Sequence, residues 1–320
     1  MTVVEQLKQR VLSGTDLTKE DAMGLIDVPL GELTRAADEI RRKICRSAFD
    51  LCTIVNGKCG TCSEDCKYCA QSIRYHTDCS VSYPLRSTEE LLEGARRSRE
   101  QKVMRYAIVT SGKALSDREV DQVCESIRAI REQVGVAVCV SFGLLKEEAF
   151  HKIRQAGATR VHCNLESSER FFQEICTTHS YQEKIDTLQA ANRAGLSICS
   201  GGILGLGETM EDRIDMVLTA RELGVTSIPV NVLHPIPGTP YEHNRVLSNE
   251  EVCRCVAIFR FLLPGAFIRL AGGRGLLGDQ GEACLQSGAN AAISGDMLTT
   301  SGIGVEADRK LFRKLGFEVK

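Results

Sequence analysis

Three cysteines stand close together in the segment Cys62-Ser-Glu-Asp-Cys66-Lys-Tyr-Cys69. Their C-x3-C-x2-C spacing lets three thiolates reach one metal centre, and thiolates are favoured ligands of zinc and of iron–sulfur clusters. A closed structural zinc site needs four ligands, and Cys59 could supply the fourth. Three ligands alone suit a 4Fe–4S cluster that leaves one iron open for a small molecule. The count of three therefore favours the cluster, with zinc as the alternative.

The segments that must position these thiolates alternate between short β-rich runs and helical patterns. The predicted strands are 51–56, 104–109, 136–141, 159–165, 196–200, 226–233, 266–271 and 290–294. Capping-box pairs begin the following helices at Ser87 with Glu90, Ser116 with Glu119, Ser180 with Glu183, Thr209 with Asp212, and Ser248 with Glu251. The strand 51–56 leads directly to the cysteine triplet.

This alternation predicts an α/β protein, a (β/α)8 TIM-type barrel over residues 46–320 with an N-terminal helical extension over residues 1–45. In such a barrel the active site lies at the C-terminal ends of the strands. A doubly wound open sheet is the competing architecture.

Alternation along the predicted strands separates an aliphatic face from a polar one. The residues expected to face the barrel lumen are Cys139, Cys199, Arg269, Asn231, Asn164, Glu166 and His162. So many buried polar groups need partners, which indicates a bound ligand; the alternative is a self-satisfied polar network. The cysteines expected to be ordinary core residues are Cys163, Cys124, Cys253, Cys255 and Cys284. No role is assigned to Cys45, Cys52, Cys59 or Cys79.

Composition limits the compartment and the partners. The chain of 320 residues has a net charge of -2, which argues against nucleic acid as the main partner. No apolar run approaches the roughly 20 residues that span a bilayer, and the N-terminus mixes charged with apolar residues, unlike a signal peptide. We therefore expect a cytoplasmic protein with no membrane partner. In that reducing setting, 15 cysteines indicate metal or catalytic chemistry rather than disulfides.

The triplet, with Tyr68 before its last cysteine, is similar to the signature of the radical S-adenosylmethionine superfamily. Over nearly its whole length the chain also resembles the biotin synthases. The matching segments are Asn56–Ser72, Asn164-Leu-Glu166, Cys199–Ile203 with Gly207-Glu208, Asn231, and Ile268-Arg269-Leu270. The set of Cys139, Cys199 and Arg269 is more specific to this family than the triplet is.

The resemblance implies that Cys62, Cys66 and Cys69 hold a 4Fe–4S cluster whose electron cleaves S-adenosylmethionine to a 5′-deoxyadenosyl radical. The implied cofactor-binding residues are Tyr68 beside the adenine, Thr110 and Ser111 near the amino group, Glu166 at the ribose, Lys184 at the carboxylate, and Gly201 and Gly202 in the cofactor bed. Asn164 and Asn231 would bind the ureido ring of dethiobiotin, since an amide both donates and accepts.

The implied reaction is a sulfur transfer: two hydrogen abstractions from dethiobiotin, then insertion of sulfur from an auxiliary iron–sulfur cluster to give biotin. Three cysteines and an arginine usually surround that cluster, of 2Fe–2S type. Cys139, Cys199 and Arg269 match as catalytic ligands, but the remaining cysteine position is Ala107. We expect Cys176 to replace it, with an ordinary loop thiol as the alternative. This resembles an anaerobe-type subgroup with a larger, four-iron auxiliary cluster.

The family resemblance also implies a flavodoxin or ferredoxin as electron donor and a homodimer. Two other functions stay open: another radical enzyme on the same barrel, of the hydrogenase-maturation or methylornithine type, or a non-catalytic iron–sulfur carrier. The first would share the triplet but would not be expected to gather Cys139, Cys199 and Arg269 in the lumen. A carrier has no need of a lumen lined with amides.

Overall fold

A parallel β-barrel forms the centre of the computed structural model, which describes residues 1–77 and 81–319 and so leaves Cys79 outside the described residues. The strands are β1 (Asp50–Lys58), β2 (Arg105–Thr110), β3 (Ala137–Ser141), β4 (Arg160–His162), β5 (Ser197–Cys199), β6 (Gly202–Leu204), β7 (Ser227–Val232), β8 (Phe267–Leu270) and β9 (Ala291–Ile293). Their order is β5-β4-β3-β2-β1-β9-β8-β7-β6, and a further β5–β7 pairing closes the sheet. The short segments β5 and β6 therefore share one position in the barrel.

The closed sheet confirms the predicted (β/α)8 barrel and excludes the open doubly wound sheet. Each predicted strand segment overlaps an observed strand, whereas β6 was not predicted. The segment 159–165 was predicted too long, because the ladder of β4 ends at His162. Beyond it the chain runs irregularly to Glu166, whose backbone is left-handed with φ of 72°.

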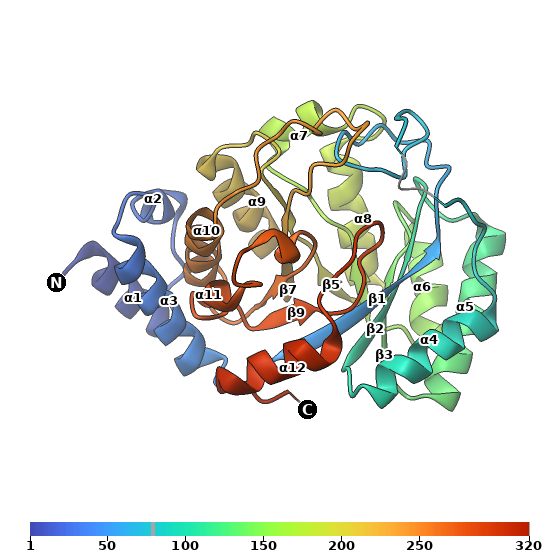
Figure 1. Cartoon of the computed structure of the whole chain (residues 1–320), viewed down its shortest axis with the longest axis horizontal. Helices are drawn as coiled ribbons and strands as arrows, with labels where there is room; N and C mark the ends of the chain where they lie inside the picture. Colours follow the sequence, from blue (N-terminus) through green and yellow to red (C-terminus); the bar gives the residue numbers. More distant parts are fainter. Residues whose placement is uncertain (78–80, 320) are drawn as a thin grey trace.

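Helices cover the outside of the barrel (Figure 1). They are α1 (Val3–Leu12), α2 (Lys19–Met23), α3 (Leu30–Ile44), α4 (Thr88–Glu100), α5 (Asp117–Gln133), α6 (Glu147–Ala156), α7 (Glu169–Ile175), α8 (Tyr181–Arg193), α9 (Met210–Glu222), α10 (Asn249–Leu262), α11 (Glu282–Leu285) and α12 (Val305–Lys314), with a 3-10 turn, η1 (Arg274–Leu276). All five predicted capping boxes are present, at the starts of α4, α5, α8, α9 and α10. The capping boxes in the sequence therefore predicted the starts of these five helices.

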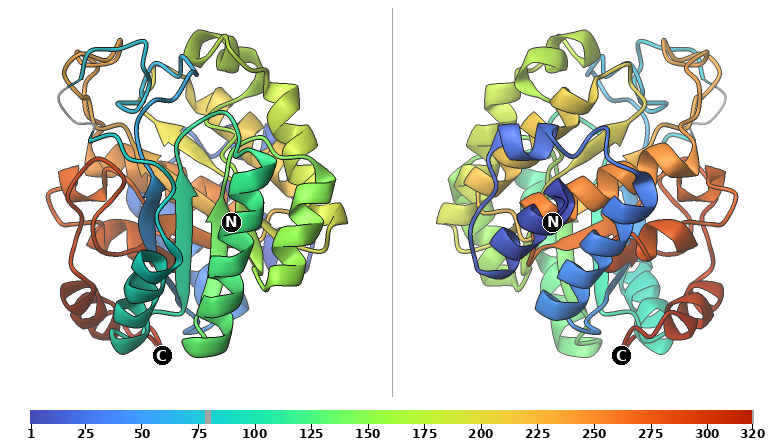
Figure 2. Two further views of the ribbon diagram at one scale, coloured as in Figure 1. Left: turned by 90° about the vertical axis from the view of Figure 1, so that its right-hand side faces the viewer. Right: turned by 90° about the vertical axis from the view of Figure 1, so that its left-hand side faces the viewer.

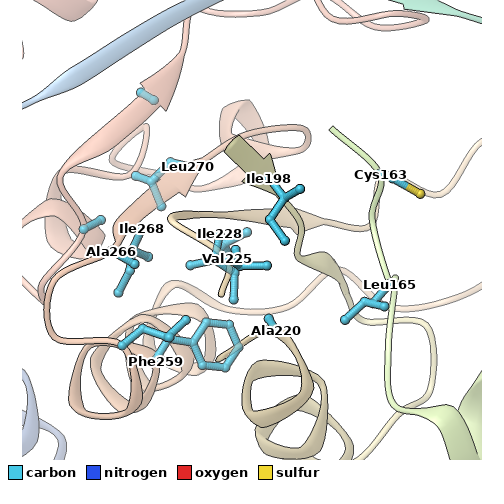
Figure 3. Packing of buried hydrophobic residues seen from close by; sticks show 14 of the residues in the cluster. Cys163, Leu165, Ile198, Ala220, Val225, Ile228, Phe259, Ala266, Ile268 and Leu270 are labelled. Carbon is cyan, nitrogen blue, oxygen red and sulfur yellow. The ribbon is translucent and has the colours of Figure 1, made fainter. Parts of the chain in front are cut away.

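Side-chain alternation along the strands works as the sequence predicts. Ile198, Ile228 and Ile268 point outward and pack with Phe259 of α10 and Ala220 of α9 (Figure 3). Burial of this aliphatic face against the helices stabilises the barrel by the hydrophobic effect. The opposite face of the same strands is left to line the lumen.

The first three helices, α1 to α3, precede the barrel and pack against α9 and α10 (Figure 1). Lys19 of α2 bonds to Asp215 of α9 at 2.7 Å, which adds a polar link to this packing. Among the described residues, no helix is both long and apolar enough to cross a membrane.

The C-terminal ends of the strands face one end of the barrel, which is the upper end in both views of Figure 2. Residues 59–77, which follow β1, and the loop after β7 both lie at this end (Figure 2). The triplet loop therefore sits where a barrel of this class places its active site.

Candidate active site

A cavity of about 430 Å³ opens at the C-terminal ends of the strands. Its volume lies within the roughly 300–1,000 Å³ typical of small-molecule sites. All seven predicted lumen residues line it: Cys139, Cys199, Arg269, Asn231, Asn164, Glu166 and His162. The triplet lines its mouth, beyond the end of β1, while Cys139 and Arg269 lie within strands and therefore deeper.

The triplet loop is held in shape by its own backbone. Cys62 donates its N–H to the carbonyl of Gln71 at 3.1 Å, and Cys69 donates to that of Cys66 at 2.9 Å. Ile73 donates to the carbonyl of Cys62 at 2.9 Å. These bonds turn the loop back on itself, so that all three thiols face the same cavity.

The geometry favours a cluster over zinc at this loop. Cys59 and Cys62 form a CxxC pair in addition to Cys66 and Cys69, so the sequence is compatible with a four-cysteine zinc site. A tetrahedral zinc ion with Zn–S bonds of about 2.3 Å holds its sulfurs about 3.8 Å apart. Within the described residues, no three of these four cysteines bring their sulfurs within 4.8 Å of one another. Cys59 instead pairs its backbone with Tyr83 and does not line the cavity.

In the structure Cys176 lies beside Cys66 of the triplet, and the centre that it is expected to share with Cys139 and Cys199 stays a prediction. The sulfur of Cys176 lies 3.7 Å from that of Cys66 and 3.3 Å from Nδ1 of His179. It does not line the cavity. The sequence correctly places Cys176 at the active-site end of the barrel, after α7, but sequence position carries no information about depth. The side chain lies behind the triplet loop rather than above the deeper cysteines.

Cys66, Cys176 and His179 together form a group whose ligand atoms lie within 4.8 Å of one another. Nδ1 of His179 also lies 2.7 Å from Oε2 of Glu64. Because Cys66 belongs to the triplet, this group overlaps the predicted 4Fe–4S site and is not separate from it.

Within the triplet loop, Tyr68 pairs with Glu166. The Tyr68 hydroxyl donates to Oε1 of Glu166 at 2.9 Å. The second oxygen, Oε2, is buried and has no hydrogen-bond partner within the described chain. A buried, unpaired carboxylate oxygen is costly unless a ligand satisfies it. A ribose hydroxyl, as the family resemblance implies, is a suitable donor.

Lys184 offers a matching cation. It lines the cavity, is buried, and makes no ion pair with any described residue. Burial lowers the pKa of its ammonium, but the nearby Cys163 and Glu166 outweigh this effect and raise the pKa overall. A buried ammonium needs an anion. A carboxylate bound in the cavity would meet this need.

Thr110 and Ser111 line the same wall, at the end of β2. The Thr110 hydroxyl donates to the carbonyl of Ser141 at 3.4 Å, and the Ser111 hydroxyl donates to that of Gly60 at 2.7 Å. Each hydroxyl can still accept a hydrogen bond. Both positions are therefore compatible with the amino group that the resemblance places near them.

Gly201 and Gly202 do not line the cavity, so their expected direct contact with a cofactor is not what the structure shows. A Cβ at Gly201 would stand 2.1 Å from the carbonyl oxygen of Pro229, and one at Gly202 would stand 2.2 Å from that of Glu166. Glu166 bonds by its N–H to the carbonyl of Gly201 at 3.0 Å. The glycines thus let backbones approach closely and fix Glu166 in its left-handed conformation.

The two asparagines, Asn164 and Asn231, also line the cavity. Asn164 accepts from the N–H of Gly201 at 3.2 Å, and its amide nitrogen makes no bond to the described residues. Asn231 donates to the carbonyl of Gly202 at 3.0 Å and accepts from the N–H of Gly272 at 2.9 Å. Both amides are held by backbone and keep bonding capacity for a ligand.

The strand residues Cys52, Cys139, Cys199 and Arg269 form the deeper part of the cavity, which we call the floor. Of these, Cys52 of β1 is a site residue that the sequence did not reveal. It forms a small buried cluster with Ala107 and Cys139, separate from the main core, and lines the cavity. Side-chain alternation along β1 would have found it, because Cys52 and Ile54 share the cavity-facing side of that strand.

Below these thiols, Asp50 holds three arginines. Its carboxylate oxygens lie 3.1 Å from Nη2 of Arg269, 3.0 Å from Nε of Arg105 and 3.2 Å from Nη1 of Arg160. Burial raises the pKa of Asp50, but the charges of Arg269, Arg105 and Arg160 outweigh it and lower the pKa to about 2. One carboxylate faces three guanidinium groups, so the floor carries a net positive charge. Such a floor suits an anionic ligand.

Cys199 of β5 is the thiol most easily ionised in this region. Burial raises its pKa, but the neighbouring His162 and the charge of Arg269 outweigh burial and lower the pKa to about 7. Ionised thiolates are the form that binds metals. Cys199 therefore fits the ligand role that the resemblance implies.

The cysteines predicted to be core residues are buried: Cys124, Cys163, Cys253, Cys255 and Cys284. Cys163 packs with the outward-facing aliphatic residues, as predicted (Figure 3), and also touches the cavity wall.

Two family models match the chain. A model of the radical SAM superfamily matches residues 58–220, and a model of the biotin and thiamin synthesis associated domain matches residues 229–318. The first match contains the triplet loop, and the second contains the strand that carries Arg269.

Curated relatives match along the whole chain. The chain is 55% identical to biotin synthase 2 of Corynebacterium diphtheriae over 319 residues, which cover 100% of this chain and 97% of the relative. It is 50% identical to the biotin synthase of Brachyspira hyodysenteriae, covering 99% of this chain and 95% of the relative.

Solved structures share the fold at much lower identity. Methylornithine synthase superposes with a TM-score of 0.84 at 18% identity, covering 98% of this chain and 96% of that one. The FeFe-hydrogenase maturase of Carboxydothermus hydrogenoformans gives 0.82 at 17% identity, covering 98% and 78%. These likenesses support the barrel alone.

Proposed function

This chain belongs to the biotin synthase family of the radical S-adenosylmethionine superfamily, and from that premise we propose how its cavity works. The proposed reaction inserts one sulfur atom into dethiobiotin, and the sulfur comes from an auxiliary iron–sulfur cluster at the floor. Neither a different radical reaction nor a carrier role is favoured by relatives that are biotin synthases over their full length.

The residues present fit the groups that this chemistry needs. Cys62, Cys66 and Cys69 would hold the 4Fe–4S cluster at the mouth, while Cys139, Cys199 and Arg269 belong to the auxiliary site. When bound, the first cluster supplies the electron that cleaves S-adenosylmethionine and the second supplies the sulfur. A flavodoxin or ferredoxin is the proposed electron donor.

Around the mouth, the side chains bind and orient S-adenosylmethionine. Lys184 binds its carboxylate, since this buried ammonium forms no ion pair with a described residue. Glu166 accepts from a ribose hydroxyl through its unpaired Oε2, while Tyr68 holds the other oxygen. A fixed ribose fixes the 5′ carbon, which keeps the abstraction distance short.

In the same cavity, Asn164 and Asn231 orient the ureido ring of dethiobiotin. Backbone bonds from Gly201 and Gly272 hold the two amides, so little side-chain entropy is lost when the ring binds. The two amides would thereby hold the ring in the cavity that the two groups of thiols line.

The observation that carries this proposal is that two groups of thiols line one cavity, one from the loop after β1 and one from the barrel strands, together with two amides held by backbone bonds. The test is anaerobic, with reconstituted protein, dithionite, S-adenosylmethionine and dethiobiotin. We expect biotin, with about two molecules of 5′-deoxyadenosine formed for each biotin. 5′-Deoxyadenosine without biotin would point to another radical reaction, and neither product would point to a carrier.

A further inference from the structure

We propose that Cys52 supplies the thiolate missing at position 107, so that Cys52, Cys139 and Cys199 bind the auxiliary cluster above Arg269. This inference rests on the proposed function, because it assumes that a cluster occupies the floor of the cavity. It replaces Cys176, which the structure places behind the triplet loop.

The barrel register brings Cys52 to the required place. In the β1–β2–β3 ladders, Ile54 is paired with Ala107 and Ala107 with Cys139, so Cys52 lies one lumen-facing step below Ile54 on the same strand. Cys52, Ala107 and Cys139 are in contact and buried. The methyl group of Ala107 is small, and a thiol from the neighbouring strand can reach over it toward Cys139. Compared with the usual family pattern, the third thiol thus comes from β1 instead of β2 and still faces the same site.

Elimination leads to the same residue. Among the described residues, the cysteines that line the cavity but lie outside the triplet are Cys52, Cys139, Cys163 and Cys199. Cys163 belongs to the aliphatic face that packs under the helices (Figure 3). Cys52 is then the third thiol on the floor.

The charges on the floor require an anion of this kind. Asp50 balances one of the three guanidinium groups that it contacts, from Arg105, Arg160 and Arg269. Nη2 of Arg269 is buried and has no well-aligned hydrogen bond among the described residues. Buried charges need compensation. An iron–sulfur cluster with three thiolate ligands is anionic and would supply it.

The test removes the three cysteine ligands at the mouth, so that only iron bound at the floor is measured. In the Cys62→Ala/Cys66→Ala/Cys69→Ala variant, any cluster iron left after anaerobic reconstitution belongs to the auxiliary site. Iron and sulfide are quantified per chain, and Mössbauer spectra of ⁵⁷Fe report the cluster type. We expect this parent to retain iron and added Cys52→Ala to lower it at least fivefold. Added Cys163→Ala, a buried thiol on the same cavity wall, and added Cys176→Ala should leave the iron unchanged.

A rescue separates ligation from packing. Adding Ala107→Cys to the Cys52→Ala variant returns a thiol to the neighbouring strand, and we expect cluster iron to return with it. If Cys52→Ala folds poorly, Cys52→Ser keeps the volume and should change the Mössbauer parameters of one iron site. Circular dichroism and thermal unfolding check the fold of every variant.

The outcomes distinguish this inference from the proposed function. Iron-free parent protein would overturn both. Parent protein that keeps its iron and spectra after Cys52→Ala or Cys52→Ser would overturn the role of Cys52 alone. Loss of iron on Cys176→Ala but not on Cys52→Ala would return the ligand role to Cys176.

Discussion

The mouth and the floor of the cavity use the same element, thiol sulfur, but are built in different ways. At the mouth, Cys62, Cys66 and Cys69 come from one loop of eight residues and are held by bonds within that loop. At the floor, Cys52, Cys139 and Cys199 come from three strands far apart in sequence and are brought together by barrel closure.

Their electrostatic surroundings differ as well. The floor has three arginines around one buried carboxylate, and two of them, Arg160 and Arg269, are buried, whereas the mouth has one buried lysine facing Glu166 and the thiols. A site made within one loop can be lost without disturbing the barrel. A site made by closure shares its residues with the barrel interior, so changes there should affect stability too.

Removing the mouth cluster should have the largest effect. Loss of outer-shell partners already costs metal sites about 10–100-fold, so Cys66→Ala should lower 5′-deoxyadenosine formation by more than about 100-fold. Anaerobic chromatographic quantification of the nucleoside measures this. Cys59→Ala, which changes a thiol that does not line the cavity, should keep near-normal formation. Equal losses in both variants would mean that Cys59 is a fourth ligand.

Charge removal at the floor should reduce stability. Asp50→Asn leaves two buried guanidinium groups, those of Arg160 and Arg269, and the partly exposed one of Arg105 without their carboxylate, and breaking buried pairs costs about 3–5 kcal/mol. Anaerobic urea denaturation of cluster-free protein measures the change. The matched control is Asp121→Asn, which breaks the surface pair with Lys152. It should cost at most about 1 kcal/mol. If both variants lost a similarly small amount of unfolding free energy, the floor would be no more important for stability than the surface pair, which would contradict the account.

Cofactor binding should depend on the unpaired oxygen of Glu166. Hydrogen bonds to charged groups contribute about 1.5–3 kcal/mol, so Glu166→Gln should raise the KM for S-adenosylmethionine by about 10–100-fold. Single-turnover rates of 5′-deoxyadenosine formation with saturating dethiobiotin, recorded over a range of S-adenosylmethionine concentrations, measure this. Glu169→Gln, at an exposed position on α7, should leave the KM unchanged. An unchanged KM for Glu166→Gln would remove Glu166 from the cofactor site.

The smallest expected effect is on dethiobiotin. Asn164→Ala removes a neutral hydrogen bond of about 0.5–1.5 kcal/mol, so the KM for dethiobiotin should rise by about 2–10-fold. The KM for S-adenosylmethionine should not change, because the two ligands contact different depths of the cavity. A shift in the KM for the cofactor instead would place Asn164 at the mouth.

The mouth could be predicted from sequence because its geometry is local. The spacing of Cys62, Cys66 and Cys69 is itself the site, and capping boxes such as Ser116 with Glu119 set the adjoining helices. The barrel could be predicted from the alternation of strands and helices, because many residues along the chain contribute to that pattern. Spacing along the sequence does not reveal depth in the barrel, so it could not predict that Cys176 lies beside Cys66.

The floor was predictable in part. Side-chain alternation placed Cys139, Cys199 and Arg269 in the lumen. Asp50 and Cys52 were missed although the same alternation on β1 points them inward, because their importance comes from contacts across strands. Gly201 and Gly202 illustrate the same limit: a glycine run in sequence does not reveal whether a ligand or a neighbouring backbone makes the close approach.

Iron content tests the two-site account most directly. Anaerobically reconstituted wild-type protein should hold more than about four irons per chain, and the Cys62→Ala/Cys66→Ala/Cys69→Ala variant should retain the excess. Wild-type protein that stops at about four irons, together with an iron-free variant, would show that the mouth is the sole metal centre and would contradict the account.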